Sequence, residues 1–236
     1  MNYAIIAAGE GSRLVQEGVS LPKPLVDIDG RPMIQRLIDI FRDCDAESIS
    51  VIVNEQMTQV RDYLETLREH IDVPLKLVVK STPSSMHSFY EVSSVFPAGS
   101  KFILTTVDTI FRPDDFSRYA AAFAADNTCD GYMAVTSYID DEKPLYIDAD
   151  GDNIITAFRD EPFEGVRYIS GGIYGLTTPA LSVLSRCMER GVSRMRNYQR
   201  ALVAAGLRLR AFDLGKIIDV DHAGDIEKAR AFLNGE

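Results

Sequence analysis

The chain has 236 residues, of which 46% are hydrophobic, and a formal net charge of −10. That length and apolar content are enough for one α/β domain with a substantial buried core. The acidic balance argues against nucleic acid or an anionic membrane surface as the main partner. It does not exclude a small anionic ligand, because a few local cations can override the overall charge.

Two features of the sequence favour a cytoplasmic location. The cysteines Cys44, Cys129 and Cys187 lie far apart and show neither paired nor metal-type spacing. The first residues lack the basic start of a signal peptide, and no apolar run approaches the ~20 residues that span a bilayer. We therefore expect a cytoplasmic protein with no membrane and no nucleic-acid partner, and a homo-oligomer is left open.

The first half of the chain alternates expected strands and helices. Short apolar runs predict buried strands, whereas apolar residues at helical spacing predict amphipathic helices. The strands are expected at 3–8, 50–53, 75–79 and 102–107. The helices are expected at 33–41, 60–71, 88–95 and 116–123. Asp114 or Asp115 is placed to cap the last of these helices.

The second half is less regular. Two short apolar runs flank Asp150-Gly151, a dipeptide that tolerates positive φ and predicts a hairpin. Further strands are expected at 132–136, 169–176, 207–212 and 217–220, and helices at 180–189, 196–205 and 225–233. The βα alternation predicts a three-layer α/β/α Rossmann-like fold with a mostly parallel mixed sheet and a small substrate lobe. We expect one domain over 1–236.

The most informative segment follows the first expected strand. It reads Ala7-Ala8-Gly9-Glu10-Gly11-Ser12-Arg13-Leu14 and then Pro22-Lys23-Pro24-Leu25. Glycines in such a loop let backbone N–H groups approach phosphates without a Cβ in the way. A dinucleotide fingerprint requires a third glycine where Leu14 stands, and a P-loop requires a Gly-Lys-Ser/Thr that is missing. The remaining interpretation places two cations, Arg13 and Lys23, around a triphosphate.

These two segments resemble the sugar-nucleotidyltransferase family, part of the MobA-like NTP transferase superfamily. The family motif runs Ala-Ala-Gly-x-Gly-x-Arg-Leu and then Pro-Lys-Pro-Leu, and the match continues through 29–34. The resemblance implies transfer of a nucleoside monophosphate from an NTP to a phosphorylated small acceptor, such as a sugar 1-phosphate, with release of pyrophosphate. It also implies a nucleotide-binding half at 1–130 and an acceptor-binding half at 131–236.

The same resemblance assigns roles in the loop. Arg13 and Lys23 are the implied catalytic residues, with Arg13 on the β- and γ-phosphates and Lys23 on the α-phosphate. A looser serine-rich segment before the expected helix at 88–95 takes the place of the family's base-contacting loop, where free helical N–H groups can meet a ligand. The implied nucleotide-binding residues are Ala7, Ala8, Gly9, Glu10, Gly11, Ser12, Arg13, Lys23, Ser84, Ser85 and Ser88.

Asp108 is the first candidate ligand for Mg²⁺. It ends the expected strand at 102–107, where α/β folds present their ligands, and a carboxylate suits Mg²⁺ there. The alternative is a turn aspartate before the next helix. In the family a metal-binding aspartate stands at this place, so the resemblance favours the metal role.

A second ligand is expected near the end of the chain. The segment 217–229 resembles the family's closing Asp-Val-Asp motif. Asp219 and Asp221 are two residues apart, so in a strand both would point to one face, where a cation would offset their repulsion. We expect Asp221 to be the metal ligand and take Asp219 as second choice, while Asp225 caps the last helix.

The acceptor site is expected around Ser170-Gly171-Gly172-Ile173-Tyr174, which resembles the family's Asn-x-Gly-Ile-Tyr strand. The glycines can also be bulge residues. Many sugar-phosphate enzymes carry Glu-Lys-Pro before this strand, but this chain has Asp160-Glu161-Pro162 and lacks that lysine. The expected acceptor-binding residues are Asp160, Gly171 and Gly172, and the expected replacement cations are Arg159, Arg167 or Arg194.

Two alternatives to a sugar 1-phosphate enzyme remain open, and the first follows from the missing lysine. A cytidylyltransferase for an alcohol phosphate of the phosphocholine type competes with a sugar 1-phosphate enzyme. A non-catalytic, nucleotide-sensing homologue is the other alternative, and the intact Arg13, Lys23 and Asp108 count against it.

Overall fold

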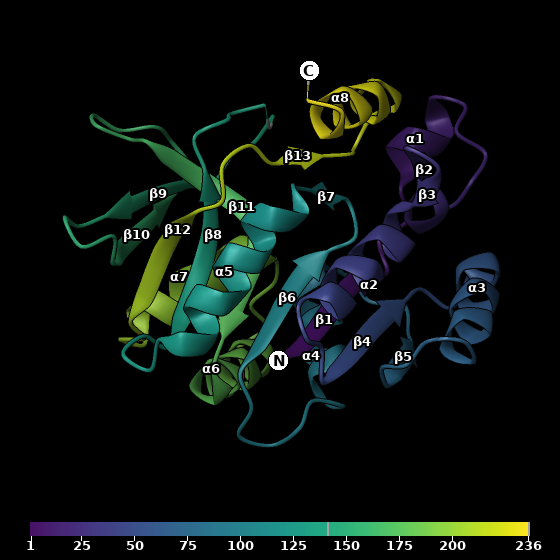
Figure 1. Ribbon diagram of the computed structural model, residues 1–236. Helices are drawn as coiled ribbons and strands as arrows, with labels where there is room; N and C mark the ends of the chain where they lie inside the picture. The colour runs from purple at the N-terminus through teal and green to yellow at the C-terminus, as the bar shows by residue number, and fades with distance from the viewer. Residues whose placement is uncertain (141, 236) are drawn as a thin grey trace.

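The computed structural model describes residues 1–140 and 142–235 and consists of a nine-stranded mixed sheet covered by helices on both faces (Figure 1). The strands are β1 Asn2–Ala7, β2 Asp27–Ile28, β3 Arg31–Pro32, β4 Ser48–Val53, β5 Leu75–Val79, β6 Phe102–Thr106, β7 Thr109–Ile110, β8 Gly131–Thr136, β9 Tyr146–Ala149, β10 Ile155–Arg159, β11 Tyr168–Leu176, β12 Leu209–Asp213 and β13 Ile218–Asp219. The helices are α1 Ser12–Gln16, α2 Met33–Asp43, α3 Thr58–Arg68, α4 Ser85–Ser93, α5 Pro113–Ala125, α6 Thr178–Glu189, α7 Met195–Ala204 and α8 Ala223–Leu233, with a 3₁₀ turn, η1, at Lys23–Leu25.

Four parallel strands form one side of the sheet, in the order β6-β1-β4-β5. All six residues of β1 and of β4 are buried. Strands that are covered on both faces are mostly apolar, and the buried polar side chains of Asn2 and Ser48 pair with each other, with the Ser48 hydroxyl donating to Asn2 Oδ1 at 2.7 Å. The parallel core expected from the sequence is confirmed.

The sheet continues into an antiparallel region beyond β6. Strand β11 pairs antiparallel with β6, β8 and β9, and β12 pairs parallel with β8. Strands β9 and β10 form the expected hairpin, but the positive φ of its turn lies at Asn153 (61°) and not at Asp150-Gly151. Instead, Asp150 accepts hydrogen bonds from the backbone N–H groups of Asp152 and Ile154, and asparagine tolerates the left-handed region.

The alternating side chains of β1 point into two separate cores. Tyr3, Ile5 and Ala7 pack in a cluster with apolar residues of α2, α3, α5 and α8, whereas Ala4 and Ile6 pack with α4, α6 and α7. Figure 1 shows these helices on the two faces of the sheet. The three-layer α/β/α arrangement is therefore confirmed.

Two local expectations differ from the structure. Helix α5 begins at Pro113 with Arg112 as its N-cap, so Asp114 and Asp115 lie in the first turn, where carboxylates interact favourably with the helix dipole. Helix α4 begins at Ser85, earlier than the expected position 88.

Among the described residues, none of the helices combines the length and apolar character needed to cross a bilayer.

Candidate active site

A cleft of about 600 Å³ opens where β1, β4 and β6 end, and we call it the loop cleft. The carboxyl ends of parallel strands are where α/β sheets present ligands. Its lining includes the segment after β1, the turn after β6 and the start of α4: Ile6, Ala8, Gly9, Glu10, Gly11, Ser12, Arg13, Lys23, Asn54, Thr82, Pro83, Ser84, Ser85, Ser88, Thr106, Val107, Asp108 and Asp221. Of the residues expected to bind nucleotide, only Ala7 lies elsewhere, because its side chain is buried in the core.

Gly11 brings the loop close to Lys23. It precedes α1 with φ of 63°, and a Cβ at this position would lie 2.9 Å from the Cβ of Lys23. Gly9 has no heavy atom within 4 Å of the corresponding position. The two glycines of the motif therefore differ: Gly11 is required by the fold of the loop, and Gly9 leaves space in front of the backbone.

This difference predicts unequal effects of two substitutions. Gly11→Ala is expected to lower the free energy of unfolding by about 1–2 kcal/mol, because a left-handed φ disfavours L side chains. Gly9→Ala is expected to change it by less than about 0.5 kcal/mol. Urea unfolding of both variants measures the two values. Equal losses would mean that neither the left-handed φ of Gly11 nor its close approach to Lys23 constrains the loop.

Lys23 lies between two carboxylates. Its Nζ is 2.6 Å from Asp108 Oδ2 and 2.7 Å from Asp221 Oδ1, and the residue is only 8% exposed. Burial alone would lower the pKa of Lys23, but the two carboxylates outweigh it and raise the pKa above its usual value. Burial likewise raises the pKa of Asp108, but the Lys23 ammonium outweighs this and holds it below the usual range. Both groups are therefore charged at neutral pH.

A short ribbon explains how Asp108 and Asp221 meet. Strand β13 pairs antiparallel with β7, with Ile218 opposite Ile110 and Asp219 opposite Thr109. The pairing continues as the backbone N–H of Val220 donates to the carbonyl oxygen of Asp108 at 3.1 Å. Asp221, which follows Val220, therefore lies beside Asp108, which precedes β7.

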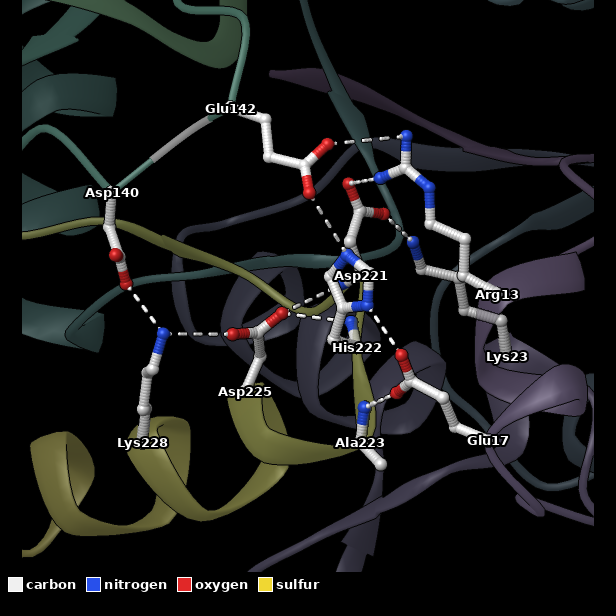
Figure 2. Close-up of polar contacts among 10 residues, drawn as sticks. All are labelled: Arg13, Glu17, Lys23, Asp140, Glu142, Asp221, His222, Ala223, Asp225 and Lys228. Carbon is white, nitrogen blue, oxygen red and sulfur yellow. Dashed lines mark hydrogen bonds and ion pairs between the residues drawn. The ribbon is translucent and has the colours of Figure 1, made fainter.

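Arg13 completes the charged network. Its Nη1 lies 3.1 Å from Asp221 Oδ2, and its side chain is about half exposed, at 52%. Figure 2 shows Arg13 and Lys23 both directed at the Asp221 carboxylate. Two cations from the segment after β1 and two carboxylates from distant parts of the chain therefore converge at the edge of the loop cleft.

A second cavity, of about 300 Å³, adjoins the loop cleft, and we call it the arginine pocket. The two cavities share Ser85, Thr106, Asp108 and Asp221. The other residues that line the arginine pocket are Lys143, Leu145, Ser170, Gly172, Tyr174, Arg194, Met195, Arg196, Gln199 and Asp219. Three cations, from the segment after β8 and from the start of α7, thus surround a space next to Asp108.

Two contacts orient the side chain of Arg196. Its Nη1 lies 2.6 Å from Asp160 Oδ1, and its Nη2 donates to the carbonyl oxygen of Lys143 at 2.8 Å. Asp160 also pairs with Arg200, at 2.7 Å. Asp160 therefore contacts the arginines and does not itself line the arginine pocket, which differs from its expected place as an acceptor contact.

The other expected acceptor residues fall in neighbouring places. Gly172 lines the arginine pocket, and Gly171 lines an adjoining cavity. Of the three replacement cations considered from the sequence, only Arg194 lines the pocket. Arg159 pairs with Asp148, and the Arg167 guanidinium lies over the Tyr168 ring. Sequence reasoning missed Arg196, although its four-residue spacing from Arg200 on an expected helix is a signal for a shared carboxylate partner.

The residues at the end of the loop cleft fit a Mg²⁺ ion. Two carboxylates, Asp108 and Asp221, reach one ammonium group, so their oxygens are close enough to share a cation. Mg²⁺ prefers oxygen ligands and is often held by one or two carboxylates together with water and substrate phosphates. Within the described ranges no group of three or more His, Cys, Asp or Glu side chains is arranged to hold a metal, so protein ligands alone would not complete the shell.

Residues 3–169, more than half of the chain, match the MobA-like NTP transferase domain. The chain belongs to this family. Among curated relatives, the chain is 32% identical over 121 residues to 2-aminoethylphosphonate cytidylyltransferase of Lancefieldella rimae, covering 48% of this chain and 47% of that one. It is 20% identical over 177 residues to D-glycero-alpha-D-manno-heptose 1-phosphate guanylyltransferase of Campylobacter jejuni, covering 75% and 76%.

A solved structure extends the likeness to nearly the whole chain. The inositol-1-phosphate CTP transferase from T. maritima superposes with a TM-score of 0.81 and 19% identity, covering 99% of this chain and 96% of that one. At this identity the likeness shows the fold alone. The chain spans about half the length of the first curated relatives that it matches, 47% and 55%.

Proposed function

We propose that this MobA-like protein transfers a nucleoside monophosphate from an NTP to a small acceptor that carries a phosphate or phosphonate, with release of pyrophosphate. The observation that carries the proposal is the position of Lys23, one buried ammonium between Asp108 and Asp221 where the loop cleft meets the arginine pocket. A cation at the junction of two cavities is suited to a phosphorus atom that passes from a ligand in one to a ligand in the other.

In this proposal residues 1–130 hold the NTP in the loop cleft and residues 131–236 supply most of the acceptor site. Backbone N–H groups of the glycine-rich loop contact phosphate oxygens, and Arg13 takes the β- and γ-phosphates. Ser84, Ser85 and Ser88 lie near the start of α4, on the part of the loop cleft where we assign the base.

The proposed chemistry is a single in-line displacement. An oxygen of the acceptor's phosphate or phosphonate attacks the α-phosphorus, a new P–O bond forms, and the bond from the α-phosphorus to the bridging oxygen breaks. That bridging oxygen leaves with pyrophosphate. The acceptor oxygen is already an anion, so no general base is required, and catalysis rests on positioning and charge neutralisation by Lys23 and Arg13.

Asp108 and Asp221 would hold Mg²⁺, with Asp219 nearby on the wall of the arginine pocket. When bound, the ion supplies positive charge to the phosphate oxygens of the nucleotide. In this proposal Lys23 stays beside both carboxylates, and its ammonium group neutralises negative charge on the α-phosphate.

The acceptor anion is assigned to the arginine pocket. Arg196 is held by Asp160, and Arg194 and Lys143 line the same pocket. These three cations would supply the positive charge that other family members obtain from a lysine at the position of Glu161. Guanidinium groups bind phosphate and phosphonate oxygens in the same way. The named relatives act on a phosphonate in one case and on a sugar 1-phosphate in the other, and we keep both acceptor classes.

The test is pyrophosphate release from each of the four NTPs with a panel of acceptors: hexose and heptose 1-phosphates, inositol phosphate, phosphocholine and 2-aminoethylphosphonate. We expect release with one NTP to depend on one class of acceptor. Arg196→Gln should then raise the KM for the acceptor at least tenfold while NTP binding stays unchanged, because it removes one charge-assisted contact. NTP binding without pyrophosphate release from any acceptor would favour the nucleotide-sensing alternative.

A further inference from the structure

Helix α1, which carries Arg13, is too short to be stable by itself. It spans Ser12–Gln16, and among its residues only Leu14 is buried. Val15 is 61% exposed. Isolated helices of fewer than about 12 residues are marginal in water, so the position of α1 has to be set by contacts with the rest of the molecule.

Glu17 provides such a contact at the end of α1. Its Oε2 accepts the backbone N–H of Ala223, the first residue of α8, at 2.6 Å. Its Oε1 lies 2.6 Å from His222 Nδ1. The N–H groups in the first turn of a helix have no partner within that helix, so the Glu17 carboxylate caps α8 from another element. Figure 2 shows Glu17 directed at these two residues.

Arg13 and Glu17 contact consecutive parts of one segment. Glu17 follows the last residue of α1, and its backbone N–H donates to the carbonyl oxygen of Arg13 at 3.0 Å, so the two residues are one helical turn apart. Arg13 contacts Asp221, whereas Glu17 contacts His222 and Ala223, the two residues that follow Asp221. The stretch that carries the proposed metal ligand is therefore attached to α1 at both ends.

The two attachments differ in what happens when a triphosphate enters. Arg13 has to exchange its contact with Asp221 for the incoming phosphates. Glu17 does not line the loop cleft, so with the proposed function a bound triphosphate would leave its bonds to His222 and Ala223 in place. Hydrogen bonds from His222 and Ala223 lower the pKa of Glu17, so its carboxylate stays ionised at neutral pH.

We propose that Glu17 is a positioning residue, which holds α1 against the start of α8 so that Arg13 is presented to the triphosphate at a fixed distance from Asp221. This inference rests on the proposed function, since it assigns Glu17 a part in NTP binding. It distinguishes Glu17 from a surface glutamate that contributes only to stability.

The test is a double-mutant cycle on NTP affinity, measured by calorimetry with Mg²⁺ present. Arg13→Ala is expected to weaken NTP binding at least tenfold, and Glu17→Ala about fivefold. In the Arg13→Ala background, Glu17→Ala should weaken binding no further, because there is no guanidinium left to position. Glu17→Gln retains one acceptor oxygen and should weaken binding less than Glu17→Ala. Glu227→Gln on α8, whose carboxylate pairs with Arg230, is the matched control and should leave affinity unchanged.

Each outcome bears on the inference. Additive effects of Glu17→Ala and Arg13→Ala would overturn it and leave Glu17 a purely structural residue. If Glu17→Ala does not fold, the same cycle is run with Glu17→Gln, and additivity has the same meaning. Normal affinity in Arg13→Ala would also overturn the inference, although turnover with the acceptor panel could still uphold the proposed function. If the unsubstituted protein binds none of the four NTPs, the proposed function fails and the inference fails with it.

Discussion

Lys23→Ala is expected to lower turnover about 10²-fold while the protein remains folded. Removing one preorganised positive group from a site of charge transfer typically costs this much. The loss should appear mainly in kcat, because Arg13 and the loop backbone still bind the triphosphate. The free energy of unfolding should also fall, since Asp108 and Asp221 would then face each other without the ammonium that lies 2.6 and 2.7 Å from them. Steady-state kinetics and urea unfolding measure the two effects.

Lys80→Ala is the matched control for this substitution. Lys80 is an exposed lysine that pairs with Glu91 at 2.8 Å and lines neither the loop cleft nor the arginine pocket. Exposed pairs of this kind contribute about 1 kcal/mol or less to stability, so this variant should have normal turnover. If Lys23→Ala were as active as Lys80→Ala, Lys23 would be a structural cation and the proposed role at the α-phosphate would be lost.

The part of the loop cleft that follows β1 could be anticipated from the sequence because its residues are local. A strand, a glycine-rich loop and a lysine follow one another within a short stretch, so Gly9, Gly11, Arg13 and Lys23 could be read from spacing and resemblance. Asp108 could be placed because the end of a buried strand fixes the edge of the sheet at which it lies. The metal and phosphate roles of these residues stay predictions.

The contacts between distant elements could not be predicted in the same way. Glu17 carries no local signal, because its partners Ala223 and His222 are joined to it only through the packing of α1 on α8. Asp160 was expected beside the acceptor, but the structure places it against Arg196 and Arg200 on α7. Which face of α7 meets the hairpin strands is decided by tertiary packing, and the sequence pattern alone does not contain it.

The alternation of Asp219 and Asp221 was a partly correct guide. Strand β13 ends at Asp219, so Asp221 lies beyond it and the face argument does not strictly apply. Both side chains nevertheless line the arginine pocket. Asp221 contacts both Lys23 and Arg13, which supports its choice as the proposed metal ligand.

The three carboxylates are expected to differ in their effect on Mg²⁺-dependent NTP binding. Asp108→Asn and Asp221→Asn should each weaken this binding at least tenfold, because each removes a negative charge at the proposed metal position. Asp219→Asn should weaken Mg²⁺-dependent NTP binding less, because in this assignment Asp219 does not bind the metal directly and acts only through the residues that do. Calorimetric titrations with MgNTP, and with NTP in the presence of a chelator, measure the contrast.

Stability without Mg²⁺ provides an independent check on the same three variants. Lys23 and Arg13 already offset the charge of Asp221 in the free protein, so removing this carboxylate relieves no repulsion. Asp221 is 45% exposed, and Asp221→Asn should lower the free energy of unfolding by about 1 kcal/mol or less. Asp108→Asn should lower it more, by about 1–3 kcal/mol, because the Asp108 side chain is less exposed than that of Asp221, 23% against 45%, so its contact with Lys23 is less screened by water. An inactive Asp219→Asn beside a fully active Asp221→Asn would reverse the metal assignment. Equal NTP binding with and without Mg²⁺ in the unsubstituted protein would show that these carboxylates do not bind a metal and only form ion pairs with Lys23 and Arg13.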